Sequence, residues 1–474
     1  MKLSAALAVG VLGVAFTVAL GTAGGAPARA AGNPVRAENL HRGSRAWRIK
    51  RLPPHVLEGY ASQVSVAPGE QLRLHVSVVA GARYRVRVFR IGWYGGTGGR
   101  SMRCCGRPHT GALQTIPRPV PATGLLALRW PVTDTVRVGR DWVSGYYVAN
   151  LVLASGPQAG RGTTVPFVVR TARDRRATIL VQAAVNTWQA YNRWGGTSLY
   201  QNHTGVGDDH VSFDRPYSQR GAPPEGGSEA NLPQAWEFPL VRFLERYGYD
   251  VAYTTDVDTD RDPSELLRHR LVMTAGHDEY WTKAMRDGFE AARTAGVNLA
   301  FMGANTGYWQ MRYEDGRRTI VEYRTADRDP EPDPALKTVQ FRDLAKPRPE
   351  CTLEGVQWGE IGSADYSPVG AAMTPPDPWF AGTGFRATDV LRALVGYEYD
   401  TIFDACPTPP LTRLFGASLP GHVNPAAVRY TAPSGAIVFS SGSIRFAVGL
   451  DPLGGRGDPR LQRFMRNALA DLAR

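Results

Sequence analysis

The sequence predicts two folded parts: an antiparallel β-sandwich over residues 59–170, then an α/β domain with a mostly parallel sheet over residues 171–474. Residues 59–170 hold short apolar strands of period two, separated by proline and glycine and without intervening helices, which is typical of a sandwich. Beyond residue 177, continuous apolar runs alternate with helical patterns, which is typical of a parallel sheet covered on both faces. Residues 313–423 are proline-rich and follow neither pattern, so we expect an irregular insertion there.

The first 31 residues predict export. A positive start is followed by small and aliphatic residues as far as Leu20, and Ala28-Arg29-Ala30 has the small-x-small pattern that signal peptidases read. We therefore expect a signal peptide over residues 1–31, cleaved near Ala30/Ala31, and a secreted mature chain without stable membrane association. Residues 32–58 are expected to form an N-terminal extension.

The charge of the chain does not indicate a nucleic-acid partner. The formal net charge is +12, but only five of the 55 basic residues are lysine and the arginines are scattered. No basic block with interleaved aromatic residues is present, which is the pattern that tracks phosphates. We therefore expect no nucleic-acid binding.

The four cysteines predict a disulfide in a chain that is expected to be exported. Cys351 and Cys406 are the preferred pair, because a bridge between them closes an insertion inside one domain. The adjacent Cys104 and Cys105 either form a strained vicinal disulfide or stay reduced, and the sequence leaves both alternatives open. The chain has no CxxC spacing of the kind that binds metals.

In the sandwich, we expect strands wherever apolar and polar residues alternate between turn residues. They cover residues 64–66, 71–76, 84–89, 147–152 and 165–169. The loop over residues 95–99 is rich in glycine, but no Lys-Ser/Thr pair follows it, so we interpret it as a turn rather than a phosphate-binding loop.

In the α/β domain, we expect buried strands where apolar runs are continuous and helices where apolar residues recur with a period near 3.6. The strands cover residues 178–182, 251–254, 271–274, 297–302 and 436–439, and the helices include residues 240–244, 285–292 and a closing amphipathic helix over 461–472.

Polar and aromatic residues follow four of these strands, at 186–192, 256–258, 276–281 and 303–309. In open α/β sheets, ligands bind beyond the carboxyl ends of the strands, so we expect these residues to gather at one site. Asp256 and Asp258 are expected to be loop or capping residues rather than ligands.

The sharpest signal is His277-Asp278-Glu279. In α/β-hydrolase and glutamine-amidotransferase-like architectures, of which we expect the second here, a tight turn at such a strand end holds a nucleophilic Ser or Cys. This chain has neither residue at the turn and no GxSxG motif. An imidazole and a carboxylate two residues apart suit metal ligation or acid–base chemistry. The alternative is that His277 or Asp278 caps the following helix.

Several motifs resemble the catalytic large subunit of N,N-dimethylformamidase and its exported relatives. The likeness runs from about residue 59 to the C-terminus, in the same order. It is carried by RIGWYGG at 90–96, TWQAYN at 187–192, SFDRPY at 212–217, GHDEYW at 276–281 and GAN at 303–305.

The resemblance implies a hydrolase of small amides with a mononuclear Fe³⁺ ion held by two tyrosines and one glutamate. By motif, the ligands would be Tyr191, Tyr217 and Glu279. His277 would be an outer-shell or acid–base residue, and Asn305 would orient substrate or water. The insertion is expected to add a glutamate, for which Glu398 in GYEYD at 396–400 is the candidate.

Phenolate and carboxylate are hard oxygen donors that suit Fe³⁺, while zinc, manganese or another divalent metal is the alternative. The sequence leaves open whether the chain forms a homo-oligomer and whether it binds a small accessory subunit. The competing function is a non-catalytic or carbohydrate-binding surface protein with a degenerate α/β scaffold. In that case Trp93 and Tyr94 would stack on sugar rather than contact the α/β domain.

Overall fold

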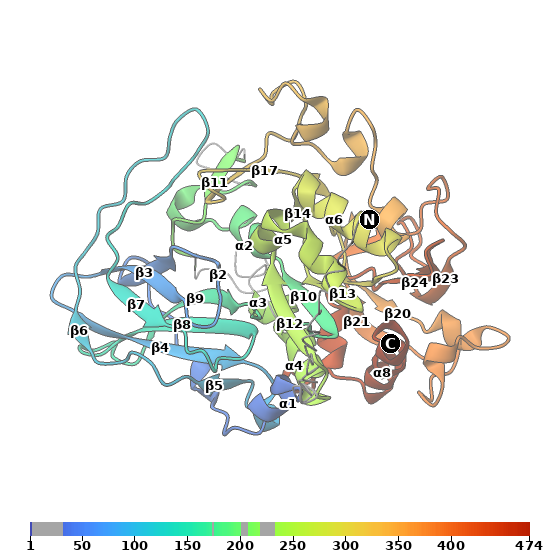
Figure 1. The fold of residues 1–474 in the computed structure, drawn as a ribbon, viewed down its shortest axis with the longest axis horizontal. Coiled ribbons are helices and arrows are strands. Elements are labelled where there is room, and N and C mark those ends of the chain that lie inside the picture. Colours follow the sequence, from blue (N-terminus) through green and yellow to red (C-terminus); the bar gives the residue numbers. More distant parts are fainter. Residues whose placement is uncertain (2–31, 173–174, 201–206, 219–232) are drawn as a thin grey trace. The chain divides into compact units, whose positions relative to one another are not determined.

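The segment with period-two alternation forms two facing sheets. The structure is a computed structural model that describes residue 1 and residues 32–172, 175–200, 207–218 and 233–474. One sheet has the order β2-β9-β8-β4-β5, with β6 on β4, and the other has the order β1-β3-β7. Apolar residues of β3, such as Leu72 and Leu74, share one core cluster with Val86 and Val88 of β4, which confirms the sandwich (Figure 1). The strands are β1 (Leu57–Ala61), β2 (Ser65–Val66), β3 (Gln71–Val78), β4 (Arg83–Ile91), β5 (Gly99–Ser101), β6 (His109–Thr110), β7 (Asp134–Arg137), β8 (Gly145–Leu153) and β9 (Gly162–Val169).

The second sheet has seven strands in the order β12-β10-β13-β15-β25-β24-β23. The first five strands pair in parallel, and β24 and β23 add to the edge in antiparallel fashion, so the sheet is mostly parallel as predicted. Its strands are β10 (Ile179–Ala183), β12 (Val251–Thr255), β13 (Leu271–Gly276), β15 (Asn298–Gly303), β23 (Thr412–Gly416), β24 (Ala426–Thr431) and β25 (Ile437–Ser440).

Helices cover both faces of this sheet. Successive side chains of a strand point to opposite sides, so the apolar residues of one strand pack against helices on both faces. Ile179 and Val181 of β10 pack in the cluster that contains Leu240 of α4, whereas Leu180 packs in the cluster that contains Phe289 of α6. The helices are α1 (Pro34–Glu38), α2 (Val185–Ala190), α3 (Pro233–Trp236), α4 (Phe238–Arg246), α5 (Asp256–Arg261), α6 (Lys283–Thr294), α7 (Cys351–Glu354) and α8 (Pro459–Leu472).

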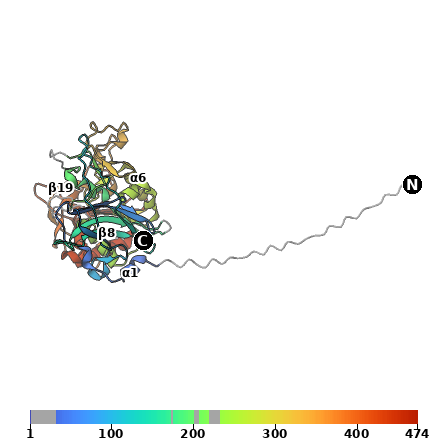
Figure 2. The same ribbon diagram turned by 90° about the vertical axis from the view of Figure 1, so that its left-hand side faces the viewer.

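Most of the proline-rich segment forms small two- and three-stranded sheets rather than a further layer. The expected insertion at 313–423 is too long at its C-terminal end, because residues 412–416 form β23 of the seven-stranded sheet. In the view of Figure 2, β19 of this segment and α6 lie on opposite sides. The Cys351–Cys406 disulfide is present, as predicted, and closes a loop of 55 residues. Cys104 and Cys105 are free thiols. The short strands are β11 (His210–Ser212), β14 (Tyr280–Trp281), β16 (Trp309–Gln310), β17 (Arg312–Glu314), β18 (Thr319–Val321), β19 (Gln357–Ile361), β20 (Ala364–Tyr366), β21 (Leu391–Val395) and β22 (Glu398–Thr401).

A buried ion pair joins the sandwich to the α/β part. Arg90 near the end of β4 is fully buried and donates from its two terminal guanidinium nitrogens to Glu245 of α4, at 2.8 and 2.7 Å. Tyr94 is 3% exposed, and its hydroxyl donates to Glu38 at 2.6 Å. The ring of Trp93 lies under the guanidinium of Arg246 at 5.0 Å. The RIGWYGG segment therefore contacts the α/β part, and Tyr94 is not available to stack on sugar.

Residues 33–474 form one compact unit. The expected boundary near residue 171 stays a prediction, and the expected signal peptide lies outside the described residues except for Met1. Across the described part of the chain, no helix has the length and hydropathy needed to cross a bilayer.

Candidate active site

Three neighbouring parallel strands deliver the predicted residues to one edge of the sheet. β10, β13 and β15 pair in register, with Gln182 opposite Thr274 and Thr274 opposite Phe301. α2 follows β10 and has Tyr191 as its C-cap, while the His277-Asp278-Glu279 turn follows β13. The prediction that these strand ends converge is therefore correct.

Glu279 lies at the centre of this edge and is 2% exposed. Its Oε2 accepts a hydrogen bond from the Tyr191 hydroxyl at 2.8 Å, and its Oε1 accepts one from the Tyr200 hydroxyl. Its backbone N–H donates to Thr187 Oγ1 at 2.9 Å, so α2 fixes the turn. The Nε2 of His277 lies 3.3 Å from Glu279 Oε2. One buried carboxyl group thus contacts two phenols and an imidazole.

Glu398, the first residue of β22, belongs to the insertion and faces the side chains that surround Glu279. Its Oε1 lies 3.8 Å from His277 Nε2. Its Oε2 accepts hydrogen bonds from Asn305 Nδ2 at 2.7 Å and from Trp358 Nε1 at 3.0 Å. The structure therefore brings Glu398 and Asn305 to the Glu279 cluster.

Burial sets the protonation of these groups. It raises the pKa of Glu279 to about 7 and, together with the charge of Glu279, raises the pKa of Glu398 to about 8. It lowers the pKa of His277 to about 3, so the imidazole is neutral near pH 7 and its contact with Glu279 is not an ion pair. The cluster is rich in oxygen donors and poor in compensating positive charge.

The donor set fits a hard metal ion. Two phenol oxygens and two carboxyl groups are the ligand types that suit Fe³⁺, and Asn305 Oδ1 is buried without a hydrogen bond from the described residues. No group of three or more His, Cys, Asp or Glu side chains arranged for a metal occurs in the described chain. A metal at this edge would therefore depend on the tyrosines.

Tyr217 has different surroundings from Tyr191. It is half-buried after β11, its pKa is raised by burial, and the charged groups with the largest effects on it are Arg318, Arg215 and Glu237. The charged group with the largest effect on Tyr191 is Glu279. The role of Tyr217 as a ligand stays a prediction, whereas the structure brings Tyr200 to Glu279.

The capping alternative for His277 and Asp278 is wrong. Helix α6 begins after Thr282, whose side chain accepts the hydrogen bond from the Met285 N–H. His277 and Asp278 are therefore not its cap. Asp256 and Asp258 lie in the first turn of α5, which Thr255 caps. Asp256 itself accepts a hydrogen bond from the Asn186 N–H in the first turn of α2 at 2.8 Å, so the capping expectation is confirmed for Asp256.

Sequence reasoning missed Tyr200 and Arg324. The guanidinium of Arg324 lies 4.5 Å from the centre of the Tyr200 ring and 5.1 Å from that of Trp309, and it donates to the Tyr280 hydroxyl at 3.2 Å. The Tyr280 hydroxyl in turn donates to the Tyr200 hydroxyl at 2.7 Å. Tyr200 and Arg324 come from separate loops, and neither belongs to a periodic pattern.

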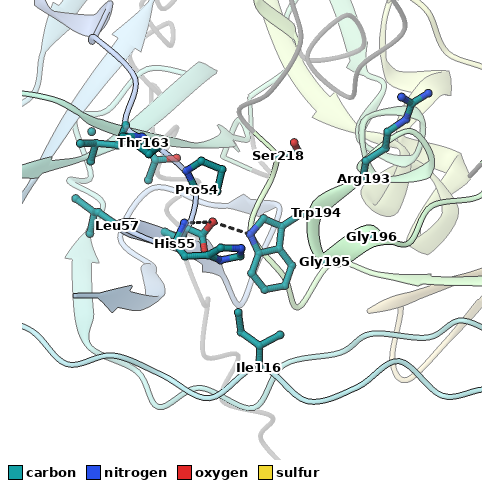
Figure 3. Close-up of a pocket in the computed structure, with 14 residues that line it drawn as sticks. Pro54, His55, Leu57, Ile116, Thr163, Arg193, Trp194, Gly195, Gly196 and Ser218 are labelled. Carbon is teal, nitrogen blue, oxygen red and sulfur yellow. Dashed lines mark hydrogen bonds and ion pairs between the residues drawn. The ribbon is translucent and has the colours of Figure 1, made fainter. Parts of the chain in front are cut away.

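A cavity of about 520 Å³ lies beside the segment that follows Tyr191. Figure 3 shows His55 and Trp194 at this cavity. Glu58, which also lines the cavity, accepts hydrogen bonds at its Oε1 from Trp194 Nε1 at 2.9 Å and from the His55 backbone N–H at 3.0 Å. The carboxylate thereby ties the strand β1 to the turn after α2. We interpret the Glu58 contacts at this cavity as structural support for that turn.

Glu237, next to α4, predicts a pH dependence of stability. It is buried, accepts hydrogen bonds from Tyr146 and Trp188, and has a pKa raised by burial to about 8. The folded state keeps a proton that the unfolded chain loses above its usual pKa of 4.5. Stability from this group is therefore present below pH 4.5 and is lost as the pH rises towards 8.

We expect the Glu237→Gln variant to lose less stability than the wild type between pH 5 and pH 8, by up to about 1.4 kcal/mol per pH unit. Urea unfolding at several pH values measures this difference. Parallel pH profiles for the two proteins would contradict a neutral buried Glu237.

The chain is similar to known proteins over part of its length. A family model described as "N,N-dimethylformamidase beta subunit-like, C-terminal" matches residues 85–460. The β subunits of N,N-dimethylformamidase from Alcaligenes sp and Paracoccus aminophilus are each 28% identical to this chain over 135 residues. The aligned part spans 27% of this chain and 17% of each relative.

Proposed function

The chain belongs to the N,N-dimethylformamidase β-subunit-like family, and we propose from this membership that it is a metal-dependent hydrolase of small amide C–N bonds. The observation that supports the proposal most strongly is the contact of Glu279 with two tyrosine hydroxyls, with Glu398 directly beyond His277. The relatives are named as β subunits, and the role of this chain as a catalytic large subunit is part of the proposal.

We propose that Tyr191, Tyr200 and Glu279 hold the metal, with Tyr217 as the ligand that the family motif offers in place of Tyr200. The oxygen donors favour Fe³⁺ over softer metals. When bound, such an ion supplies a Lewis acid that polarises an amide carbonyl and makes a water molecule more acidic near neutral pH.

The side chains around the proposed metal position have separate roles in the proton transfers. In the ionised form, which a bound cation would favour over the raised pKa of the metal-free site, Glu398 is placed to take a proton from the attacking water. It then returns the proton to the leaving nitrogen, which is a poor leaving group unless protonated. Asn305 and Trp358 hold Glu398 Oε2, so Oε1 remains directed towards His277. The Oδ1 atom of Asn305 is placed to accept a hydrogen bond from water or from an amide N–H.

Metal content and visible absorption of the purified protein test the ligand set. We expect about one iron per chain and a tyrosinate-to-iron charge-transfer band. Iron and colour should both be lost in Glu279→Ala. The band should weaken or shift in Tyr191→Phe and Tyr200→Phe.

Two further variants complete the experiment. Tyr308→Phe, at an aromatic residue that does not contact Glu279 through its hydroxyl, is the matched control and should keep the band. A band that survives in Tyr200→Phe and disappears in Tyr217→Phe would move the second tyrosine ligand to Tyr217. A colourless, iron-free protein that still hydrolyses small amides would overturn the ferric proposal.

Five parallel strands with the site at their carboxyl ends support a glutamine-amidotransferase-like architecture without the nucleophile. Export through residues 1–31 is proposed from their sequence pattern, and the N-terminal mass of the secreted protein tests it. Sugar binding through Trp93 and Tyr94 is not proposed, because Tyr94 is buried against Glu38.

A further inference from the structure

A serine and a histidine of the sandwich lie in hydrogen-bond contact, apart from the Glu279 site. Ser62 follows the last residue of β1, and His75 lies in β3, where it pairs with Tyr60 of β1. Ser62 Oγ lies 2.7 Å from His75 Nε2. Figure 1 shows β3 in the sandwich, away from β13 and α2. Neither residue has a part in the proposed amide hydrolysis.

The contacts of His75 determine which of its ring nitrogens carries the proton. Nδ1 lies 2.7 Å from the carbonyl oxygen of Trp130, and a carbonyl oxygen can only accept a hydrogen bond. Nδ1 must therefore be the protonated nitrogen. Nε2 of the neutral ring is then an acceptor, so the Ser62 hydroxyl donates to it. This is the tautomer in which histidine acts as a general base towards a serine.

Two contacts hold the ring of His75 in one orientation. The Tyr60 ring stacks on the imidazole with a centroid distance of 4.6 Å and an interplanar angle of 9°. The Trp130 carbonyl holds the ring in place from the other side. A hydroxyl, a base and a group that orients the base are thus arranged in series, which is the general signature of an activated nucleophile.

The pair opens onto a hollow of about 420 Å³ whose lining includes apolar residues, two arginines and the carboxylate of Asp214. Leu128 and Trp130 supply the apolar wall, and Arg129 and Arg318 supply the positive charge. Arg318 also forms an ion pair with Asp214 at 2.6 Å, so its charge is largely compensated. Arg129 is exposed and faces the hollow without such a carboxylate among the described residues.

We propose that Ser62 is the nucleophile of a second hydrolytic site, which cleaves short carboxylic esters that carry an anionic group. The Ser62 oxygen forms a bond to the ester carbonyl carbon, and its proton moves to His75 Nε2. The C–O bond to the alcohol breaks, and the alcohol leaves with that proton. Water then releases the acid and restores the Ser62 hydroxyl with His75 again as the base. Arg129 attracts the anionic group of the ester.

A fluorophosphonate probe, which forms a covalent bond only with activated serines, tests the nucleophile in the full-length protein. We expect one phosphonyl group per chain, located on Ser62 by peptide mass spectrometry. Ser62→Ala should remove the modification. His75→Gln should slow it by about a hundred-fold or more, because the general base is lost. Ser101→Ala, at an exposed serine of the same sandwich, is the matched control and should react as the wild type does.

The wild-type protein alone tests the nucleophile even if a His75 variant does not fold. Absence of modification at Ser62, or modification at an equal rate at Ser101, would overturn the proposal. An unchanged rate in a folded His75→Gln protein would also overturn it, because Ser62 would then not depend on its base.

The substrate class is tested with two nitrophenyl esters, the neutral acetate and the anionic succinate half-ester. We expect Ser62-dependent release of nitrophenol to be up to about five-fold faster with the succinate, and Arg129→Gln to abolish that preference. Equal rates for the two esters in the wild type would contradict the role of Arg129.

Discussion

Replacement of Arg90 by methionine is expected to lower the free energy of unfolding by about 3–5 kcal/mol, because the variant leaves Glu245 buried without its partner. Both side chains of the pair are fully buried, and Arg90 donates to both oxygens of the Glu245 carboxylate. Urea unfolding, followed by tryptophan fluorescence at pH 7, measures the loss.

A double-mutant cycle separates the pair from the packing around it. Glu245→Met should also destabilise the protein, and the double variant should be more stable than the sum of the single effects predicts, since neither charge then remains alone. Arg83→Met at the exposed start of β4 is the matched control and should change stability by no more than about 0.5 kcal/mol. A single Arg90→Met effect of that small size would show that the pair does not hold the sandwich to α4.

Replacement of Glu398 by glutamine is expected to reduce kcat for amide hydrolysis by about 10²–10⁴-fold while the protein stays folded. The glutamine oxygen can occupy the place of Oε2 and accept the same hydrogen bonds from Asn305 and Trp358. The variant loses only the group that takes and returns a proton. Steady-state kinetics on a small N-alkyl amide measure the effect, with thermal unfolding as the test of folding.

A glutamate on the paired strand offers a control for this variant. Glu360 of β19 accepts a hydrogen bond from Tyr399 at 2.9 Å and contacts His422 at 2.8 Å, away from Glu279. Glu360→Gln should leave kcat within about two-fold of the wild-type value. If Glu398→Gln keeps full kcat with the metal bound, the proton transfers must be assigned to another residue.

The order of elements could be predicted from the sequence because periodicity reflects burial directly. The alternating strands of the sandwich and the continuous run at 178–182 each indicate how many faces of a strand are covered. The order of strands in the sheet, with β12 and β13 on either side of β10, depends on pairings distant in sequence that periodicity does not encode. The Arg90–Glu245 pair joins residues 155 positions apart, so periodicity could not predict it either.

The candidate site could be predicted only in part. Tyr191, Glu279 and Asn305 follow strands whose carboxyl ends must meet at one edge of the sheet, so their convergence follows from topology. Tyr200, Arg324 and Trp358 reach the site from loops and from the insertion, where no periodic pattern constrains position. Glu398 could be proposed from the family motif, but not from the chain's own pattern.

The disulfide between Cys351 and Cys406 has a consequence for the production of this protein. The bridge encloses β19 and β22, which carry Trp358 and Glu398. In a reducing cytoplasm this loop would close without its covalent link, and the chain-entropy account assigns such a link about 4 kcal/mol. Recombinant protein from the cytoplasm should therefore contain molecules in which the main sheet is formed but the segment that carries Glu398 is loosened. Periplasmic or secretory expression is the appropriate source for enzymology.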